Sequence, residues 1–143
     1  MSVQGLPVEG LNTVGQIVAT NALTFHAGEN GLEIALALLS THTAGAPVVD
    51  GTGHYIGFIN EFGVMRALDA GKDLDKLTAE DIMRKDRLII NGSTKIVDAA
   101  KMMEEHHVIS LPVEKNGLVT YSVSRHDLLR ARIGLGLGMG IEP

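Results

Sequence analysis

The sequence predicts an α+β protein of two repeated units, each built in the order strand, helix, strand, strand, helix (β-α-β-β-α). The first observation is a repeat, because equivalent residues recur at a spacing of 65 before the hairpins and of 64 after them, since the second hairpin is shorter by one residue. These pairs are Ile17 with Ile82, Pro47 with Pro112, and Arg66-Ala67 with Arg130-Ala131. The second observation is the length of 143 residues, which leaves each half too small to bury its own sheet face. The two halves should therefore pack on each other with pseudo-two-fold symmetry.

The first unit is assigned to residues 14–71, after an arm over 1–13 that contains glycine and proline and has no clear period. Apolar residues at helical spacing predict a helix over 29–41. They form one stripe, which consists of Leu32, Ala35, Leu36 and Leu39. Asn60 is a good helix N-cap and Gly71 a good helix stop. The other predicted elements are a short strand over 22–25, strands over 46–49 and 55–59, and a helix over 60–70.

A polar connector over 72–78 leads to the second unit, which is assigned to residues 79–133. Ser93 or Thr94 is predicted to open a helix that reaches His106. The inner face of that helix is predicted to carry Ile96, Ala100 and Met103. Asn116-Gly117 is the strongest hairpin signal in the chain. The other predicted elements are a helix start at 78–81, strands over 88–90, 111–114 and 118–123, and a last helix that begins at Ser124.

Charge is distributed unevenly along the chain. Residues 1–65 contain five acidic residues and no Lys or Arg, whereas residues 66–143 contain all 12 basic residues and 12 acidic ones. The chain lacks the positive excess of a nucleic-acid binder, so no nucleic-acid partner is expected. An anionic small ligand would find its cations in the second half. The sequence has no cysteine, no apolar run as long as a membrane span and no signal peptide, which predicts a cytoplasmic protein.

The stretch Ser124-Arg125-His126-Asp127 joins the end of an apolar strand to the start of a helix. Ser124 is a good N-cap and Asp127 lies three residues later, so a hydroxyl and a carboxylate flank the free N–H groups of a helix start. Such N–H groups and neighbouring cations attract phosphate, and a carboxylate can accept hydrogen bonds from ribose hydroxyls. The alternative is a capping box with aspartate in place of glutamate, which has only a structural role.

The repeated order resembles a tandem pair of cystathionine-β-synthase (CBS) domains, the Bateman module, over about residues 14–132. The segments that carry the resemblance are Ala44 to Asp50, Gly57-Phe58-Ile59, Glu80 to Met83, Ile109 to Val113, and Ser124 to Asp127. The resemblance implies two sheet-plus-helix halves packed through their sheets, usually as a homodimeric disc. It also implies a stand-alone regulatory protein, not an enzyme, that senses AMP, ADP, ATP or S-adenosylmethionine. Magnesium bound with the phosphates of a nucleotide is compatible with this expectation.

The family's ribose motif is Thr or Ser followed three residues later by Asp, which the second half keeps as Ser124 and Asp127. The first half has Asn60 and Gly63 at these positions and lacks the carboxylate. In the family, each cleft takes its acid from one repeat and part of its base pocket from the other. The resemblance thus implies one competent cleft at Asp127, with small residues opposite, and a filled or weak cleft at Gly63 facing Val108 to Leu111. The implied ligand-binding residues are Val18, Leu23, Ala44, Gly45, Ala46, Ser122, Val123, Ser124, Arg125, His126 and Asp127.

In this hypothesis, Asp127 accepts hydrogen bonds from ribose hydroxyls, Arg125 and His126 neutralise phosphate, and backbone 44–46 and 122–123 reads the edge of adenine. An alternative function is an adaptor or oligomerisation module whose clefts are vestigial. A weaker alternative is an enzyme or a metal carrier. No nucleophile is arranged with a base, and no metal site is expected because adjacent histidines on a helix diverge and no spacing resembles a zinc site.

Residues 134–143 form a tail in which apolar residues alternate with glycine. Glycine at this density disfavours a helix. Two interpretations are open: a flexible end, or an extended strand over 134–141 that docks on the dimer mate or on an unknown regulated protein.

Overall fold

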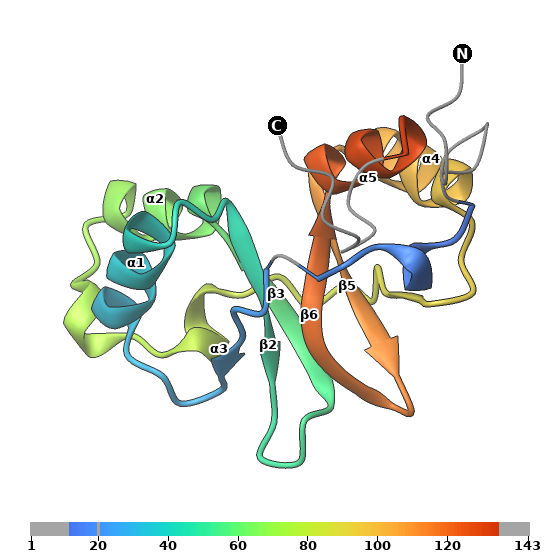
Figure 1. Cartoon of the computed structure of the whole chain (residues 1–143). Coiled ribbons are helices and arrows are strands. Elements are labelled where there is room, and N and C mark those ends of the chain that lie inside the picture. The colour runs from blue at the N-terminus through green and yellow to red at the C-terminus, as the bar shows by residue number, and fades with distance from the viewer. Residues whose placement is uncertain (1–11, 20, 135–143) are drawn as a thin grey trace.

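The computed structural model of the chain describes residues 12–19 and 21–134, and its elements follow the predicted order twice (Figure 1). The first half consists of η1 (Val14–Gln16), β1 (Phe25–His26), α1 (Gly31–Ser40), β2 (Gly45–Val49), β3 (Tyr55–Asn60) and α2 (Glu61–Asp69). A short helix, η2 (Leu74–Lys76), connects the halves. The second half consists of α3 (Ala79–Ile82), β4 (Ile90–Asn91), α4 (Ile96–His106), β5 (Ser110–Lys115), β6 (Leu118–Ser124) and α5 (Arg125–Arg132).

Each half contains one three-stranded sheet, in the order β1-β2-β3 or β4-β5-β6. The central strand pairs in parallel with the short first strand and antiparallel with the third. Pro47 lies opposite Phe58 in the first sheet, and Pro112 lies opposite Ser122 in the second. Because equivalent prolines occupy equivalent registers, the predicted α+β class and the repeated β-α-β-β-α order are confirmed.

The two sheets lie between two helix pairs, with α1 and α2 on one side and α4 and α5 on the other (Figure 1). Each sheet packs with its helices in its own apolar core, and the largest fully buried side chains include Phe25 and Ile34 in the first core and Ile96 in the second. The segments exchange, because α3 contributes Ala79 and Ile82 to the first core and the η1 segment contributes Val14 and Ile17 to the second. A third buried cluster joins the halves. It combines Val49, Tyr55 and Phe58 of the first sheet with Val119 of the second. This shared cluster completes the burial that neither half achieves alone.

Helix starts and hairpin turns use the side chains that the sequence indicates. Asn60 caps α2, since its Oδ1 accepts a hydrogen bond from the Gly63 N–H at 2.9 Å. Asn116 and Gly117 have φ values of 54° and 82°, the left-handed conformation of a tight hairpin. The predicted helix after Ser93 begins three residues later, at Ile96. Ser93 instead donates from its hydroxyl to Asn91 Oδ1 at 2.6 Å, which keeps this segment in a turn.

The predicted apolar stripe of α1 does not face the core. Leu32, Leu36 and Leu39 are 40%, 55% and 66% exposed, whereas Ile34 and Leu38 are buried. The helix has apolar residues at helical spacing on two faces, so the sequence is compatible with either face being buried. The sheet covers only the face with Ile34 and Leu38. In α4, two of the predicted inner residues are buried, but the fully buried alanine is Ala99 and not Ala100.

The short outer strands also differ from their predicted bounds, since the first is Phe25–His26 and not 22–25, and the fourth is Ile90–Asn91 and not 88–90. Each pairs with its neighbour at only two positions, which is too short to leave a clear period in the sequence. Most of the predicted arm over 1–13, and the tail beyond Gly134, lie outside the described residues.

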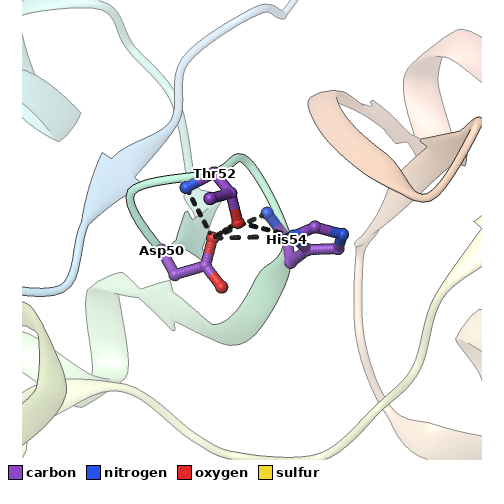
Figure 2. Close-up of polar contacts among 3 residues, drawn as sticks. All are labelled: Asp50, Thr52 and His54. Atoms are coloured by element: carbon purple, nitrogen blue, oxygen red, sulfur yellow. Dashed lines mark hydrogen bonds and ion pairs between the residues drawn. The ribbon is translucent and has the colours of Figure 1, made fainter.

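The turn between β2 and β3 is held by Asp50, as Figure 2 shows. Asp50 Oδ1 accepts hydrogen bonds from the Thr52 hydroxyl at 2.7 Å, the Thr52 N–H at 2.9 Å and the His54 N–H at 3.0 Å. These bonds, the hydroxyl bond first, lower the pKa of Asp50 from 3.8 to about 2. Folding therefore stabilises the ionised form of Asp50 relative to its protonated form.

Asp50→Asn should lower the free energy of unfolding at pH 5 to 7, and its effect should shrink as the pH falls from about 4 to about 2. The reason is that a folded pKa below the unfolded one adds stability above pH 3.8, and this stability is lost toward pH 2. Urea unfolding of both proteins at several pH values measures the difference. Asp81, whose pKa is also lowered, is present in both proteins and cancels. A difference that stays constant with pH would contradict this account.

Candidate functional site

A cavity of about 350 Å³ opens at the start of α5, where residues of both halves meet. The first half contributes the residues between α1 and β2, and the second contributes the first turn of α5 and the start of β5. The lining residues are Asn21, Thr41, His42, Thr43, Ala44, Gly45, Ile109, Ser110, Ser124, Arg125, His126 and Asp127. The volume falls within the range of roughly 300–1,000 Å³ that small-ligand pockets have.

Ser124 and Asp127 hold each other at this helix start. Ser124 Oγ accepts a hydrogen bond from the Asp127 N–H at 3.2 Å. Asp127 Oδ2 accepts from the Ser124 N–H at 2.8 Å and from the Ser124 hydroxyl at 3.1 Å. Asp127 is only 3% exposed, and its Oδ1 lies 3.6 Å from Arg130 Nη1. The capping box therefore forms, and it fixes a buried carboxylate at the wall of the cavity.

The same capping box occurs at α3, where neither of its residues lines the cavity at α5 or the cavity at α2. There the Thr78 N–H and hydroxyl donate to Asp81 Oδ2 at 2.8 and 3.1 Å. Asp81 is exposed, whereas Asp127 is buried beside the residues that follow α1. The box by itself therefore has a structural role, and its position against the other half distinguishes Asp127.

The wall opposite Asp127 is made of small residues, as the sequence predicts for residues 44 and 45. Gly45 is buried, and a Cβ atom at this position would lie 2.7 Å from both the Ile59 carbonyl oxygen and Phe58 Cε1. A larger residue therefore does not fit here without moving β3. Ala44 and Gly45 therefore add little side-chain volume to this wall of the cavity.

The sequence did not indicate Asn21 as part of this wall. The side-chain Nδ2 of Asn21 donates to Ser122 Oγ at 3.1 Å, and the backbone carbonyl oxygen of Asn21 accepts from the Ser122 N–H at 3.1 Å. Thr41 and His42 were also missed. A signal for His42 was available, because it is equivalent to His107, and both residues adopt left-handed φ values, 52° and 54°, after a helix.

The structure brings six of the eleven predicted ligand-binding residues to the cavity. They are Ala44, Gly45, Ser124, Arg125, His126 and Asp127. The other five do not line it: Val18, Leu23, Ala46, Ser122 and Val123. Ala46, Ser122 and Val123 are buried within the sheets, while Val18 is 44% exposed.

Ile109 and Ser110 line this cavity as well as the one at α2, although the sequence analysis assigned them to the α2 cleft alone. β2 and β5 contact each other, and Ala44, which precedes β2, lines both cavities too. The cavity at α2 measures about 120 Å³. Its lining residues are Ala44, Phe58, Asn60, Glu61, Phe62, Arg84, His107, Val108, Ile109 and Ser110.

Charged side chains of both signs surround the larger cavity. Arg125 and His126 are exposed at the start of α5, and His42 approaches from the first half. A guanidinium and imidazoles can donate to phosphate oxygens, while the Asp127 carboxylate can accept from hydroxyl groups. The cavity therefore presents complementary groups to a phosphorylated sugar.

No cluster of three or more His, Asp or Glu side chains within residues 12–19 and 21–134 is placed to hold a metal ion. Within the same part of the chain, no helix has the length and apolar character needed to cross a bilayer.

Comparisons with known proteins agree on one family. The family model for the CBS domain matches residues 14–70 and again residues 79–134. A CBS domain-containing protein of Dictyostelium discoideum is 30% identical over 128 residues, which cover 81% of this chain and 88% of that protein. An uncharacterised protein of Methanopyrus kandleri is 26% identical over 120 residues. The chain spans only 25% to 61% of the length of that protein and three other curated relatives.

Solved structures of CBS domain pairs share the fold. The CBS domain pair of protein MJ0100, in complex with 5′-methylthioadenosine and S-adenosyl-L-methionine, superposes with a TM-score of 0.73 at 24% identity. The match covers 82% of this chain and 93% of that one. CBSX2 in complex with AMP gives a TM-score of 0.70 at 21% identity over 83% of this chain and 94% of that one. With two matches to the family model across most of its length, the chain belongs to the CBS-domain family and contains a pair of CBS domains.

Proposed function

We propose that the chain is a regulatory CBS pair that binds an adenine nucleotide or a related adenosine compound in the cleft at Asp127. The single observation that carries the proposal is the cavity of about 350 Å³, whose wall combines a buried carboxylate with small residues of the other half. The complexes of MJ0100 and CBSX2 support the ligand class, because their ligands share an adenosine moiety. AMP, ADP, ATP and S-adenosylmethionine are the candidates, and magnesium would bind with the phosphates.

In this proposal Asp127 accepts from the ribose hydroxyls and the small residues Ala44 and Gly45 leave room for adenine. Arg125 and His126 bind the phosphate, since both are exposed at the mouth of the cavity. Ligand binding acts on a partner only if the ligand binds two arrangements of the halves or subunits with different affinities. The regulated partner is a protein, and the tail over 134–141 is a candidate for its contact. We place the protein in the cytoplasm, where adenine nucleotides are abundant.

Arg125→Ala should weaken the binding of AMP by about tenfold, because one charge-assisted hydrogen bond to phosphate contributes about 1.5 kcal/mol. Binding of adenosine, which has no phosphate, should not change. Isothermal titration of the wild type and the variant with both compounds tests the proposal. Arg132→Ala is the matched control, because Arg132 is an exposed arginine of the same helix that does not line the cavity. An equal loss for adenosine and AMP would contradict a phosphate role for Arg125.

The adaptor alternative is favoured by a different observation, the exposed apolar faces of the helix pairs. On α1 and α2 the exposed residues are Leu32, Leu36, Leu39, Phe62, Met65 and Leu68, and in the second half they include Val97, Ile109, Leu129 and Ile133. Large contiguous patches of exposed apolar residues usually mark protein interfaces. We propose that these faces pair in a homodimer, whether or not the cleft binds a ligand.

A further inference from the structure

The two clefts of the chain are equivalent in construction but different in size. Each is lined by the start of a last helix, by the residues before a central strand of the other half, and by one residue from the segment before the short first strand. In the larger cleft that residue is Asn21, and in the smaller cleft it is Arg84. The cavities measure about 350 Å³ and about 120 Å³.

The backbone shows that Asn21 and Arg84 occupy corresponding places. Asn21 forms an isolated bridge with Ser122, and Arg84 forms one with Phe58. Ser122 and Phe58 are themselves equivalent, because they lie opposite Pro112 and Pro47. The small polar pair of Asn21 and Ser122, of which only Asn21 lines the larger cleft, therefore corresponds to an arginine and a phenylalanine that both line the smaller one.

Four contacts hold Arg84 in the smaller cleft. Its guanidinium carbon lies 4.5 Å from the centroid of the Phe58 ring, at cation–π distance. Its Nε pairs with Asp86 Oδ2. Its backbone N–H donates to the Phe58 carbonyl oxygen at 2.9 Å, and its own carbonyl oxygen accepts from the Phe58 N–H at 3.0 Å. The arginine is thus anchored at both its backbone and its side chain.

One nitrogen of the Arg84 guanidinium makes no hydrogen bond within residues 12–19 and 21–134. Its Nη2 is buried and has no hydrogen-bond partner among the residues that the structure describes. An unsatisfied buried donor is unfavourable, so the hydrogen bonds of the guanidinium do not by themselves account for an arginine at this position. The volume that the side chain occupies offers a reason for its presence.

We propose that Arg84, stacked on Phe58, occludes the first-half cleft and limits the CBS pair to one adenosine-type ligand. This inference rests on the proposed function of the Asp127 cleft. Replacing Arg84 by a small residue should open a second site that uses the start of α2. That site should bind about ten- to a hundredfold more weakly than the first, because Gly63 supplies no carboxylate for ribose.

The test is the stoichiometry of AMP binding, measured by isothermal titration on the full chain and checked by equilibrium dialysis at millimolar AMP. The wild type should bind one AMP per chain and Arg84→Ala should bind two. Arg87→Ala is the matched control. The guanidinium carbon of Arg87 lies 5.8 Å from the centroid of the Tyr55 ring, and Arg87 does not line the cleft. The Arg87→Ala variant should bind one AMP per chain. In the double variant Arg84→Ala/Asp127→Ala neither cleft has a carboxylate for ribose, so both sites should bind AMP with the weak affinity of the new site.

The outcomes separate this inference from the proposed function. If the wild type binds one AMP and folded Arg84→Ala also binds one, occlusion by Arg84 is wrong while the proposed function stands. Two sites in the wild type would overturn the inference in the same way. If neither protein binds AMP, the same titrations are made with ADP, ATP and S-adenosylmethionine, and both proposals fail if none of the four binds. Circular dichroism on each variant confirms that its fold is retained before the stoichiometries are compared.

Discussion

Asp127→Ala should weaken AMP binding by about ten- to a hundredfold and leave the chain folded. A hydrogen bond to a charged group contributes about 1.5–3 kcal/mol, and the carboxylate is the proposed acceptor for ribose hydroxyls. Because Asp127 is 3% exposed and fixed by Ser124, the ligand meets a group that is already in position. The N-cap itself survives, since Ser124 Oγ still accepts from the N–H of residue 127. Isothermal titration with AMP and with adenosine gives the affinities.

The matched control for this variant is Asp81→Ala. Asp81 makes the same capping box, with donor-to-oxygen distances of 2.8 and 3.1 Å, but it is exposed and lines none of the cavities described. Its removal should lower the melting temperature without changing the affinity for AMP. If both variants reduce binding equally, the effect of Asp127 is one of helix capping and the ribose role is wrong.

Leu39→Glu combined with Phe62→Glu should convert the proposed homodimer into monomers. These two side chains are each 66% exposed, on α1 and α2 of one apolar face. In a two-fold symmetric interface each substitution occurs twice, so four carboxylates would lose water contact without a partner. Each buried unpaired charge costs more than about 1–3 kcal/mol, so the dimer should weaken by at least about a hundredfold.

Light scattering coupled to size-exclusion chromatography measures this change directly. Leu118→Glu is the control, because Leu118 is an apolar residue, 38% exposed, in the β5–β6 hairpin and away from the helix faces. The control should stay dimeric. A wild type that is monomeric at high concentration, or a double variant that remains dimeric, would contradict pairing through α1 and α2.

The architecture was predictable from the sequence because the residues that reveal the repeat occupy equivalent structural positions in the two units. Pro47 and Pro112 take equivalent places in the central strands, and Asn60 and Ser124 both act as helix caps. The two-residue strands β1 and β4 were placed only approximately, because pairing over two residues leaves no period to read.

Other features depend on tertiary contacts that a pattern does not contain. The outward stripe of α1 is as apolar as its inward one, so only the position of the sheet decides which is buried. Asn21 and Arg84 are placed at their clefts by isolated bridges to Ser122 in β6 and to Phe58 in β3. No local sequence motif marks either residue. The helix start at Ser124 was therefore predictable from the sequence. The contribution of Asn21 to the same cavity was not.

The most direct test of the central claim, that the Asp127 cleft binds an adenosine compound, is thermal melting of the wild type with AMP, ADP, ATP, S-adenosylmethionine or buffer alone. A ligand present at 100 times its dissociation constant adds about 2.7 kcal/mol of stability, which for a chain of this size raises the melting temperature by several degrees. We expect such a rise with at least one of these compounds and its loss in Asp127→Ala. No rise with any of them at millimolar concentration would contradict the claim and favour a module that acts through protein contacts alone.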